Sequence, residues 1–305
     1  MRPFAAGREL APGYEVIEHL ARSKVLDVYD AWSHARACRC VVKLLRPDCR
    51  DDARATSALR REGRLLARLS HPHLVRGYET LTEPLTAVVM ETLRGETVSH
   101  LVARRARRLA AVELGHLGVH LCSAIGYLHD EGILHLDLKP SNVIAEAGRA
   151  KVIDLSLARP PGRMRAGIGT WCYLAPEQAR GGEIGPAADA WGIAGVLYEA
   201  ATGLVPFGED DDEEFEYPSL RRTAHPVDRE RRLPAGLAAA IDGGLRADAG
   251  RRPSIAQIGA ACEEAARLPP AERRFGALLD RQGSGRLRRV ADDRQDVAAA
   301  NEVAL

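Results

Sequence analysis

Four polar residues near the middle of this 305-residue chain have side chains suited to chemistry on a phosphate group. Asp137, Lys139 and Asn142 fall within six positions of one another, and a short β-like run at 151–154 ends in Asp154. A carboxylate can accept a proton from a hydroxyl, and the oxygens of Asp and Asn are hard ligands of the kind that Mg²⁺ prefers. The spacing therefore indicates that this stretch could bind Mg²⁺ and accept a proton.

The same stretch resembles two motifs of one enzyme family. His135-Leu136-Asp137-Leu138-Lys139-Pro140-Ser141-Asn142 resembles the protein kinase catalytic loop H-R-D-L-K-P-x-N, and Asp154-Leu155-Ser156 resembles the metal-binding D-F-G. The other matches follow in the family's order and approximate spacing: Val42-Lys43, Glu62, Ala175-Pro176-Glu177, Asp189-Ala190-Trp191-Gly192 and Arg252. The chain is thus identified as a member of the bacterial-type, eukaryotic-like serine/threonine protein kinase family, with a degenerate glycine-rich loop.

The resemblance implies a reaction and a role for each of the four residues. ATP would donate its γ-phosphate to a hydroxyl of a protein substrate, with Mg²⁺ as the metal. Asp137 would be the catalytic base and Lys139 would lie against the transferring group, where a lysine is the family's mark of a serine/threonine preference. Asn142 and Asp154 would hold the metal.

Further positions are implied by the same resemblance. Thr170 would bridge the catalytic aspartate and lysine, and Glu177 with Arg252 would form a structural ion pair. Lys43 would hold the α- and β-phosphates of ATP. The remaining ATP-binding positions are apolar side chains around the adenine, a gatekeeper methionine and the hinge backbone: Leu20, Val28, Val41, Ile144, Met90, Glu91 and Leu93.

Glu62 is unusual because it shares the apolar face of a predicted helix over Ala53–Leu69. Leu59 and Leu66 lie three residues before it and four after it, which places all three side chains on one helical face. A charge there is costly unless it is paired. With Lys43 upstream, an ion pair is favoured over a glutamate that reaches water.

The segment that should cover the ATP phosphates departs from the family pattern. In Leu20–Val28 the three expected glycines are replaced by Ala21, Ser23 and Leu26. Because glycine lets a backbone amide approach a ligand closely, these side chains predict weaker nucleotide binding. Lys24, at the predicted tip, either contacts phosphate itself or is solvated.

The activation segment departs from the pattern in two related ways. Leu136 replaces the arginine that binds a phosphorylated loop residue in the family, and residues 157–169 contain no serine, threonine or tyrosine. The chain is therefore predicted not to be switched by phosphorylation of this loop. Leu155 fills the apolar position of the family's phenylalanine, and Ser156 replaces its glycine.

Hydrophobic periodicity indicates the elements that must position these residues. β-like alternation covers 14–20, 25–32, 40–45 and 87–90, whereas helical spacing covers 53–69, 114–129, 187–202, 237–245 and 255–268. The expected fold is α+β and bilobal, with a small β-rich lobe that carries one main helix and a larger, mostly helical lobe. The expected boundaries are an N-terminal extension at 1–13, a kinase domain at 14–268 divided into lobes at 14–90 and 96–268 by a hinge at 91–95, and a disordered tail at 269–305.

Composition fits an ordinary globular protein, with 46% hydrophobic and 28% charged residues. Lys and Arg (43) nearly balance Asp and Glu (42), which gives no indication of a nucleic-acid partner. No signal-peptide core or membrane-spanning run is expected, so the predicted compartment is the cytoplasm. The six cysteines contain no C-x-x-C pair and are expected to be reduced, buried thiols.

Alternatives to an active protein kinase remain open from the sequence. The missing glycines favour a pseudokinase that binds a partner without phosphotransfer, and a kinase that modifies a small-molecule hydroxyl is a third possibility. The run Glu209–Glu216 is acidic at every position except Phe215. It is interpreted as a solvated loop, with attraction of Arg- or Lys-rich substrates as the alternative.

Overall fold

The computed structural model describes residues 2–104, 108–208 and 217–267. Within them the chain forms two compact units. The first contains the residues up to Arg94 together with Asp154–Leu157, and the second contains Gly95–Ile153 and the residues from Ala158 onward. The acidic run at 209–216 and the predicted tail at 269–305 lie outside the described residues.

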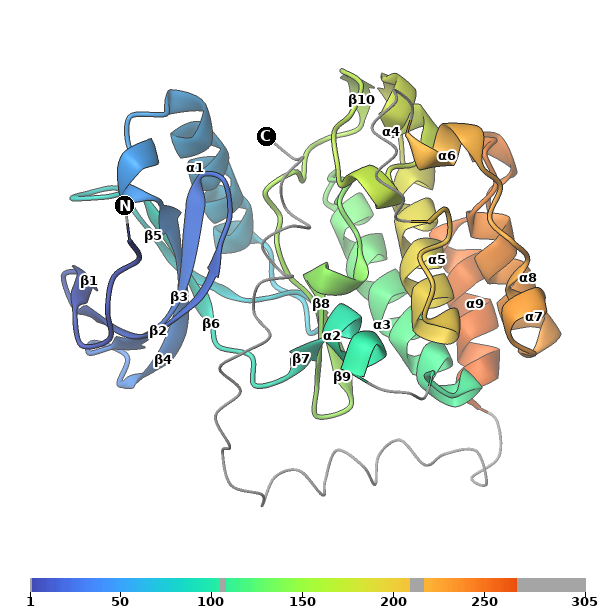
Figure 1. The fold of residues 1–305 in the computed structure, drawn as a ribbon, viewed down its shortest axis with the longest axis horizontal. Coiled ribbons are helices and arrows are strands. Elements are labelled where there is room, and N and C mark those ends of the chain that lie inside the picture. Colours follow the sequence, from blue (N-terminus) through green and yellow to red (C-terminus); the bar gives the residue numbers. More distant parts are fainter. Residues whose placement is uncertain (1, 105–107, 209–216, 268–305) are drawn as a thin grey trace. The chain divides into compact units, whose positions relative to one another are not determined.

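The first unit is built on an antiparallel sheet of six strands in the order β1-β2-β3-β4-β6-β5 (Figure 1). The turns are short, so most neighbours in the sequence pair directly. Residues before Tyr14 contribute β1, which pairs with β2. The strands are β1 (Glu9–Ala11), β2 (Tyr14–Arg22), β3 (Leu26–Ser33), β4 (Cys38–Leu45), β5 (Gly77–Leu81) and β6 (Ala87–Glu91).

One long helix, α1 (Ala53–Arg68), belongs to this unit and follows the 3-10 turn η1 (Pro47–Cys49). Asp52 caps the helix, because its carboxylate accepts hydrogen bonds from the amides of Arg54 and Ala55 at 2.9 and 3.0 Å. The helix packs against β4, β5 and β6. Its Gly63 faces Thr80 of β5 so closely that a side chain at 63 would collide with it.

The two faces of the sheet differ in what they bury. Cross-strand partners point to the same side, so Tyr29, Val42 and Val89 share one face and form its core with Leu44 and Cys40. The opposite face presents the Lys43 side chain. The register of the strands thus decides which apolar residues stabilise the unit and which stand beside the lysine.

The second unit is mostly helical (Figure 1). Its helices are α2 (Val98–Arg104), α3 (Ala111–Asp130), α4 (Pro176–Arg180), α5 (Ala187–Thr202), α6 (Pro218–Arg221), α7 (Val227–Glu230), α8 (Ala235–Gly244) and α9 (Ile255–Ala266), with 3-10 turns η2 (Pro140–Asn142), η3 (Trp171–Tyr173) and η4 (Ala249–Arg251). Its strands are β7 (Glu96–Thr97), β8 (Val143–Glu146), β9 (Arg149–Val152), β10 (Gly162–Met164) and β11 (Gly182–Ile184).

Helix α5 is the centre of this unit, since every residue from Ala188 to Thr202 is buried. It packs against α3 and α8, and α3 packs in turn against α9. Helix α9 begins at a capping box in which Ser254 and Gln257 satisfy each other's backbone amides. A helix that is buried on all sides provides a rigid support for the loops above it.

Most predicted elements are present. Two predictions are corrected, one on the end of a strand and one on the burial of the cysteines. The β-like run at 151–154 is wrong at its end, because β9 stops at Val152 and Asp154 takes a positive φ of 67° that no strand accommodates. The cysteines are only partly as expected: Cys40, Cys122 and Cys262 are buried, but Cys38, Cys49 and Cys172 are partly exposed. All six are free thiols.

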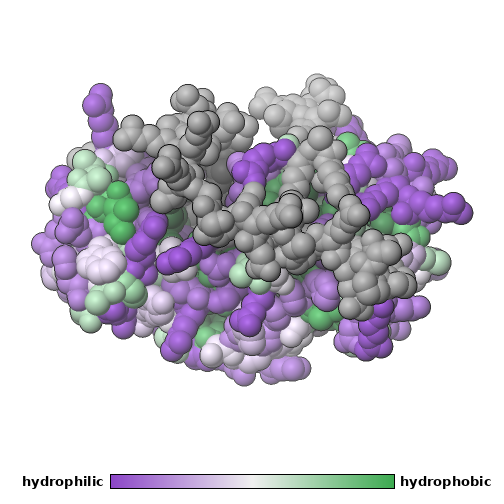
Figure 2. Space-filling view, turned by 90° about the horizontal axis from the view of Figure 1, so that it is seen from below, coloured by the Kyte–Doolittle hydropathy of each residue, from purple (hydrophilic) through white to green (hydrophobic). Residues whose placement is uncertain are grey.

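The coloured side chains on the face drawn in Figure 2 are mainly hydrophilic. Figure 2 shows one face on which the coloured hydrophobic side chains form small separate groups. Large hydrophobic side chains that are exposed among the described residues are Ile17, Trp32 and Leu204. In the same part of the chain, no helix combines the length and the apolar character that crossing a membrane requires.

Candidate active site

The second unit brings Asp137, Thr170 and Lys139 into one hydrogen-bonded chain. The Thr170 hydroxyl donates to Asp137 Oδ1 at 2.6 Å and accepts a hydrogen bond from Lys139 Nζ at 2.6 Å. Lys139 Nζ also lies 3.5 Å from Asp137 Oδ2. All three side chains are buried. The bridge that the sequence predicts for Thr170 is therefore present.

Asn142 completes this cluster from the first residues after the loop. Its Nδ2 donates to the Asp137 carbonyl at 2.8 Å and to Asp137 Oδ2 at 3.1 Å. The amide oxygen of Asn142 is consequently turned away from Asp137 and remains as a hard ligand atom. Asp137 is thus oriented through both carboxylate oxygens.

The loop that carries Asp137 is held by a buried carboxylate of α5. Asp189 accepts hydrogen bonds from the backbone amides of His135 and Leu136 at 2.9 and 2.8 Å, and its Oδ2 lies 2.8 Å from His129 Nε2. Leu136 has a φ of 67°, which costs energy for a residue with a side chain. Asp189 compensates that strain and fixes where Asp137 points.

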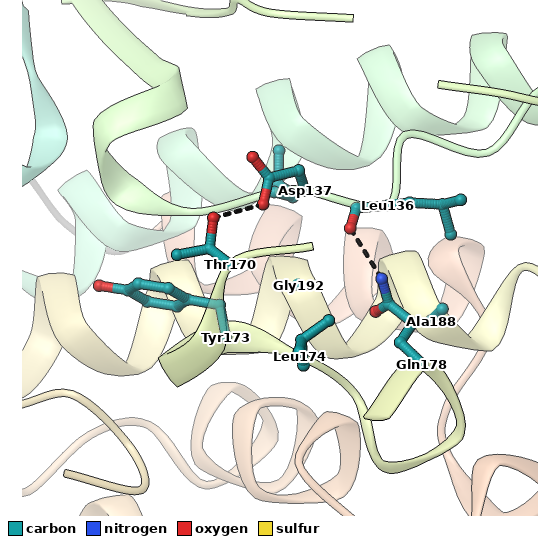
Figure 3. Close-up of a pocket in the computed structure, with 9 residues that line it drawn as sticks. Leu136, Asp137, Thr170, Tyr173, Leu174, Gln178, Ala188 and Gly192 are labelled. Carbon is teal, nitrogen blue, oxygen red and sulfur yellow. Dashed lines mark hydrogen bonds between the residues drawn. The ribbon is translucent and has the colours of Figure 1, made fainter. Parts of the chain in front are cut away.

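A second support comes from α4. Gln178 Nε2 donates to the carbonyls of Leu136 and Ile168, both at 2.8 Å, and so ties the loop to the activation segment. Figure 3 shows Asp137 and Leu136 above Thr170 and Gln178, beside a cavity of about 10 Å³. Gly192 of α5 lines this cavity, and a Cβ there would lie 2.9 Å from that of Leu138.

The ion pair predicted between Glu177 and Arg252 is also present. Two parallel hydrogen bonds of 2.6 and 2.8 Å join the guanidinium to the carboxylate. Arg252 donates further to the carbonyl of Ala187 at 2.8 Å and stacks on Trp191 at 4.9 Å from the ring centre. The pair fastens α4 to the start of α5.

The first unit contains a separate charged cluster. Lys43 Nζ lies 3.1 and 3.0 Å from the two carboxylate oxygens of Glu62 and 3.0 Å from Asp154 Oδ1. Glu62 is fully buried, whereas Asp154 keeps 25% of its side chain exposed. The ion pair expected from the position of Glu62 on the apolar face of α1 is confirmed.

Burial and mutual attraction act in opposite directions on the charges of this cluster. Burial alone would lower the pKa of Lys43, but the Asp154 and Glu62 carboxylates raise it above its ordinary value. Burial raises the pKa of Glu62, although Lys43 opposes the shift. Burial would also raise the pKa of Asp154, but Lys43 and the Ser156 amide hold it below its usual range. Lys43 and Asp154 therefore remain charged at neutral pH.

Helix α1 also holds the backbone next to Asp154. The Leu155 amide donates to Glu62 Oε1 at 3.3 Å, and Arg61 donates to the Ser156 carbonyl at 2.6 Å. The Leu155 side chain is buried, as expected for the residue that replaces phenylalanine. One helix thus positions both Lys43 and the metal-binding motif.

Three of the predicted adenine-pocket residues, Val28, Val41 and Met90, lie on the Lys43 face of the sheet. Val28 is opposite Lys43 in the β3–β4 register and Val41 is opposite Met90 in the β4–β6 register. Val28 and Val41 are partly exposed, and Met90 is buried. Of the other predicted positions, Leu20 is in β2, Glu91 ends β6, Leu93 follows it and Ile144 is in β8 of the second unit.

The segment in place of the glycine-rich loop is a closed hairpin. The Ser23 amide donates to the Leu26 carbonyl at 2.8 Å, and the Leu26 amide donates to Ser23 Oγ at 3.0 Å. Arg46 donates to the carbonyls of Ser23 and Lys24 at 3.3 and 3.0 Å. None of the three replaced glycine positions has a positive φ. Two amides of the loop are thus already used within the hairpin.

A buried charge locks the two strands of this hairpin together. Asp27 is fully buried and accepts two hydrogen bonds from Arg22 at 2.8 and 2.9 Å, and it lies 2.9 Å from His19 Nε2. Burial by itself would raise the pKa of Asp27, but Arg22 and His19 hold it below its usual range. Side-chain contacts therefore hold this hairpin, at positions where the family pattern has glycines.

Sequence reasoning missed several residues that hold the site. Asp189 was part of a recognised motif, but its partners are 53 and 54 positions away. Asp27 carried a detectable signal, because a carboxylate between strand residues of alternating burial needs a partner. Gln178 and Arg61 gave no signal, since each bonds a distant backbone carbonyl.

Comparison with known proteins establishes the family. The family model described as the protein kinase domain matches residues 14–261. The chain therefore belongs to the protein kinase domain family, whose members generally use ATP and a divalent metal.

Curated relatives from Mycobacterium and Streptomyces are similar over most of this chain. PknB of Mycobacterium tuberculosis, a serine/threonine-protein kinase, is 32% identical over 246 residues, which cover 76% of this chain and 39% of PknB. A Streptomyces coelicolor protein named "Probable serine/threonine-protein kinase" is 32% identical over 227 residues, covering 70% of this chain and 34% of that protein. The chain thus spans little more than a third of the length of these relatives.

The fold is shared with solved kinase structures. The crystal structure of the M. tuberculosis PknI kinase domain, in a cysteine-to-alanine mutant form, has a TM-score of 0.69 and 24% identity, covering 87% of this chain and all of that one. The unmutated PknI domain gives a TM-score of 0.67 at 23% identity, covering 86% of this chain and all of that one. The expected α+β, bilobal kinase fold is confirmed.

Proposed function

We propose that the chain is a protein serine/threonine kinase that transfers the γ-phosphate of ATP to a substrate hydroxyl. The observation that carries this proposal is the chain of hydrogen bonds from Lys139 through Thr170 to Asp137. Membership of the protein kinase domain family supports it. So does the naming of relatives at 32% identity as serine/threonine kinases.

Asp137 acts as the catalytic base in this proposal. Its Oδ1 accepts from Thr170 and its Oδ2 from Asn142, so the carboxylate cannot rotate when a hydroxyl arrives. A base held in a fixed orientation positions the substrate hydroxyl for in-line attack. The Asp137 carboxylate then accepts the proton of that hydroxyl. Lys139, whose Nζ lies 3.5 Å from Asp137 Oδ2, stabilises the charge on the transferring group.

Lys43 binds the α- and β-phosphates of ATP, and Glu62 keeps its ammonium in place. Both side chains of the pair are buried, so water does not compete for their contact. Asp154 and Asn142 are the proposed metal ligands, because one keeps an exposed part of its carboxylate and the other keeps its amide oxygen. Bound Mg²⁺ would neutralise phosphate charge during transfer.

The adenine base is proposed to contact apolar side chains that the core of the first unit does not use. Val28 and Val41 are partly exposed beside Lys43, which favours a ligand-binding role over packing. Met90 is the proposed gatekeeper. Further contacts come from the side chains of Leu20 and Ile144 and from the backbone of Glu91 and Leu93.

The organisation around this site is proposed as follows. The kinase domain covers 14–268, with a hinge at 91–95, after an extension at 1–13 and before a tail at 269–305. Substrates are proteins, and the acidic run Glu209–Glu216 supports a preference for Arg- or Lys-rich sequences. The proposed compartment is the cytoplasm.

Incorporation of labelled phosphate tests the proposal. The purified chain is incubated with γ-labelled ATP, Mg²⁺ and a generic basic protein substrate, beside the Asp137→Asn variant. Label in the substrate or in the chain itself, absent with the variant, supports the proposal. Nucleotide binding without transfer would replace it with the pseudokinase alternative, and equal label with both proteins would indicate a contaminating kinase.

A further inference from the structure

The outer side of α1 carries a basic groove that the proposed phosphotransfer does not use. The groove has a volume of about 380 Å³, and its lining includes Arg50, Arg60, Arg64, Ser57 and Asp51. All five residues belong to the first unit and are exposed. We call this feature the α1 groove.

Helix geometry explains why the arginines stay at the surface. Ser57, Arg60 and Arg64 follow one another at spacings of three and four, which places them on one face of α1. Leu59 and Glu62 are buried on the opposite face. The arginines cannot turn inward without disrupting the helix, so their charge is permanently presented to solvent.

The described residues leave the positive charge of the groove uncompensated. Arg50, Arg60 and Arg64 form no ion pair with any of them. The lining contains three arginines and one carboxylate, that of Asp51. The neighbouring Asp52 caps α1. Like charges along one helix face repel one another, and an anionic ligand would relieve that repulsion.

We propose that the α1 groove docks an acidic peptide segment of a partner protein. Guanidinium groups bind carboxylates through paired N–H donors, and Ser57 and Thr56 add hydroxyl donors to the same lining. A nucleic acid fits the groove less well, because it needs an extended basic surface and the chain as a whole has a net charge of +1.

Docking at this place would act on the site through the helix itself. Glu62 and Arg61 of α1 hold Lys43 and the Ser156 carbonyl, so an occupant that stabilises α1 also stabilises those contacts. This regulatory consequence rests on the proposed function, whereas the docking itself does not. It suits a chain whose residues 157–169 contain no hydroxyl for a phosphorylation switch.

Fluorescence anisotropy with a labelled acidic peptide measures the docking directly. The probe has the sequence of residues 209–216, and peptide binding is followed at low ionic strength with the full chain. A charge reversal, Arg60→Glu with Arg64→Glu, should weaken binding at least about tenfold. The matched control reverses two exposed arginines elsewhere, Arg149→Glu with Arg229→Glu, and should bind the probe as wild type does.

Two further proteins keep the test decisive. Arg60→Lys with Arg64→Lys retains the charge and should retain most of the binding, which separates the loss of charge from damage to α1. A chain with Asn or Gln at 209–214 removes acids that could occupy the groove in place of the probe. The proposal is overturned if neither this chain nor wild type binds the probe, or if both charge-reversal variants lose binding equally.

The regulatory consequence has its own readout. Addition of the probe should raise the rate of phosphotransfer by the wild-type chain and leave the Arg60→Glu, Arg64→Glu variant unchanged. Binding without any change in rate would overturn the regulatory consequence and leave the docking site intact. An absence of phosphotransfer by every protein would count against the proposed function, while the anisotropy result would still decide the docking.

Discussion

The hairpin at Leu20–Val28 and the loop at His135–Asn142 are held by different kinds of contact. The hairpin is closed mainly from within, by hydrogen bonds between Ser23 and Leu26 and by an ion pair between Arg22 and Asp27. Arg46 adds hydrogen bonds to it from 22 and 23 positions away. The loop around Asp137 depends on side chains that are 33 to 54 positions away in the sequence.

The two loops also differ in how far they depart from the family pattern. Neighbouring residues in a hairpin can be replaced together, so side-chain hydrogen bonds here substitute for three glycines of the family pattern. The loop around Asp137 has partners in α4, α5 and the activation segment, and a change in any one of them leaves a buried group unpaired. The loop with long-range support keeps Asp137, Lys139 and Asn142 and departs from the family pattern at Leu136, whereas the locally supported hairpin lacks all three glycines.

The largest expected effect is on the chemistry of the long-range loop. Asp137→Asn keeps the size of the side chain but removes the base, so turnover should fall by about 10²- to 10⁴-fold. The free energy of unfolding should fall by only about 1 kcal/mol, because Asn still accepts the hydrogen bond from Thr170 but its amide nitrogen cannot accept the one from Asn142. The measurement is the rate of labelled phosphate transfer, and a variant that keeps the wild-type rate would remove Asp137 from the proposed mechanism.

A smaller but still large effect is expected when the frame of that loop is broken. Asp189→Ala leaves the buried amides of His135 and Leu136 without an acceptor, so the free energy of unfolding should fall by about 2–4 kcal/mol. Urea denaturation measures it. Asp189→Asn keeps one acceptor and should lose less. Equal stability of both variants and wild type would show that Asp189 does not hold the loop.

The hairpin should respond in the opposite direction when its side chains are removed. Glycine at Ala21, Ser23 and Leu26 lets the backbone approach phosphate, so kcat/KM for ATP should rise about 5- to 30-fold, or about 1–2 kcal/mol. Stability should fall, because Ser23 Oγ no longer accepts from the Leu26 amide. Unchanged steady-state kinetics with ATP would mean that the closed hairpin already binds phosphate well.

The smallest effect is expected at the buried charge of the hairpin. Asp27→Asn weakens the contacts to Arg22 and His19 and should lower the free energy of unfolding by about 1 kcal/mol at neutral pH. The folded-state pKa of Asp27 is below its ordinary value of about 3.9, so its stabilisation is present above that pH and is lost as the pH falls through the folded-state pKa.

The pH profile distinguishes this effect from a simple packing defect. The difference in stability between wild type and Asp27→Asn should shrink as the solution is acidified below about pH 4. Chemical denaturation at a series of pH values measures that difference. A gap that stays constant down to acid pH would show that the charge of Asp27 does not stabilise the hairpin.

The sequence by itself determined the longer elements and which residues the proposed chemistry would use. Strands and helices with strong hydrophobic periodicity, such as the predicted helix at 187–202, are present as α5 with the same bounds. The position of Glu62 among leucines, together with Lys43 upstream, was enough to predict their pairing, because a buried charge without a partner is costly. Motif order was enough to identify the family.

Only the tertiary structure decided how the site is supported. Val28, Val41 and Met90 have the composition of core residues, and the strand register alone places them on the Lys43 face and outside the core of Tyr29 and Val42. Asp189 and Gln178 bond to backbone groups of the loop, and a backbone amide or carbonyl leaves no mark in the sequence. Such contacts form only where segments that are distant in the sequence come together, and the packing of the whole unit decides where that is.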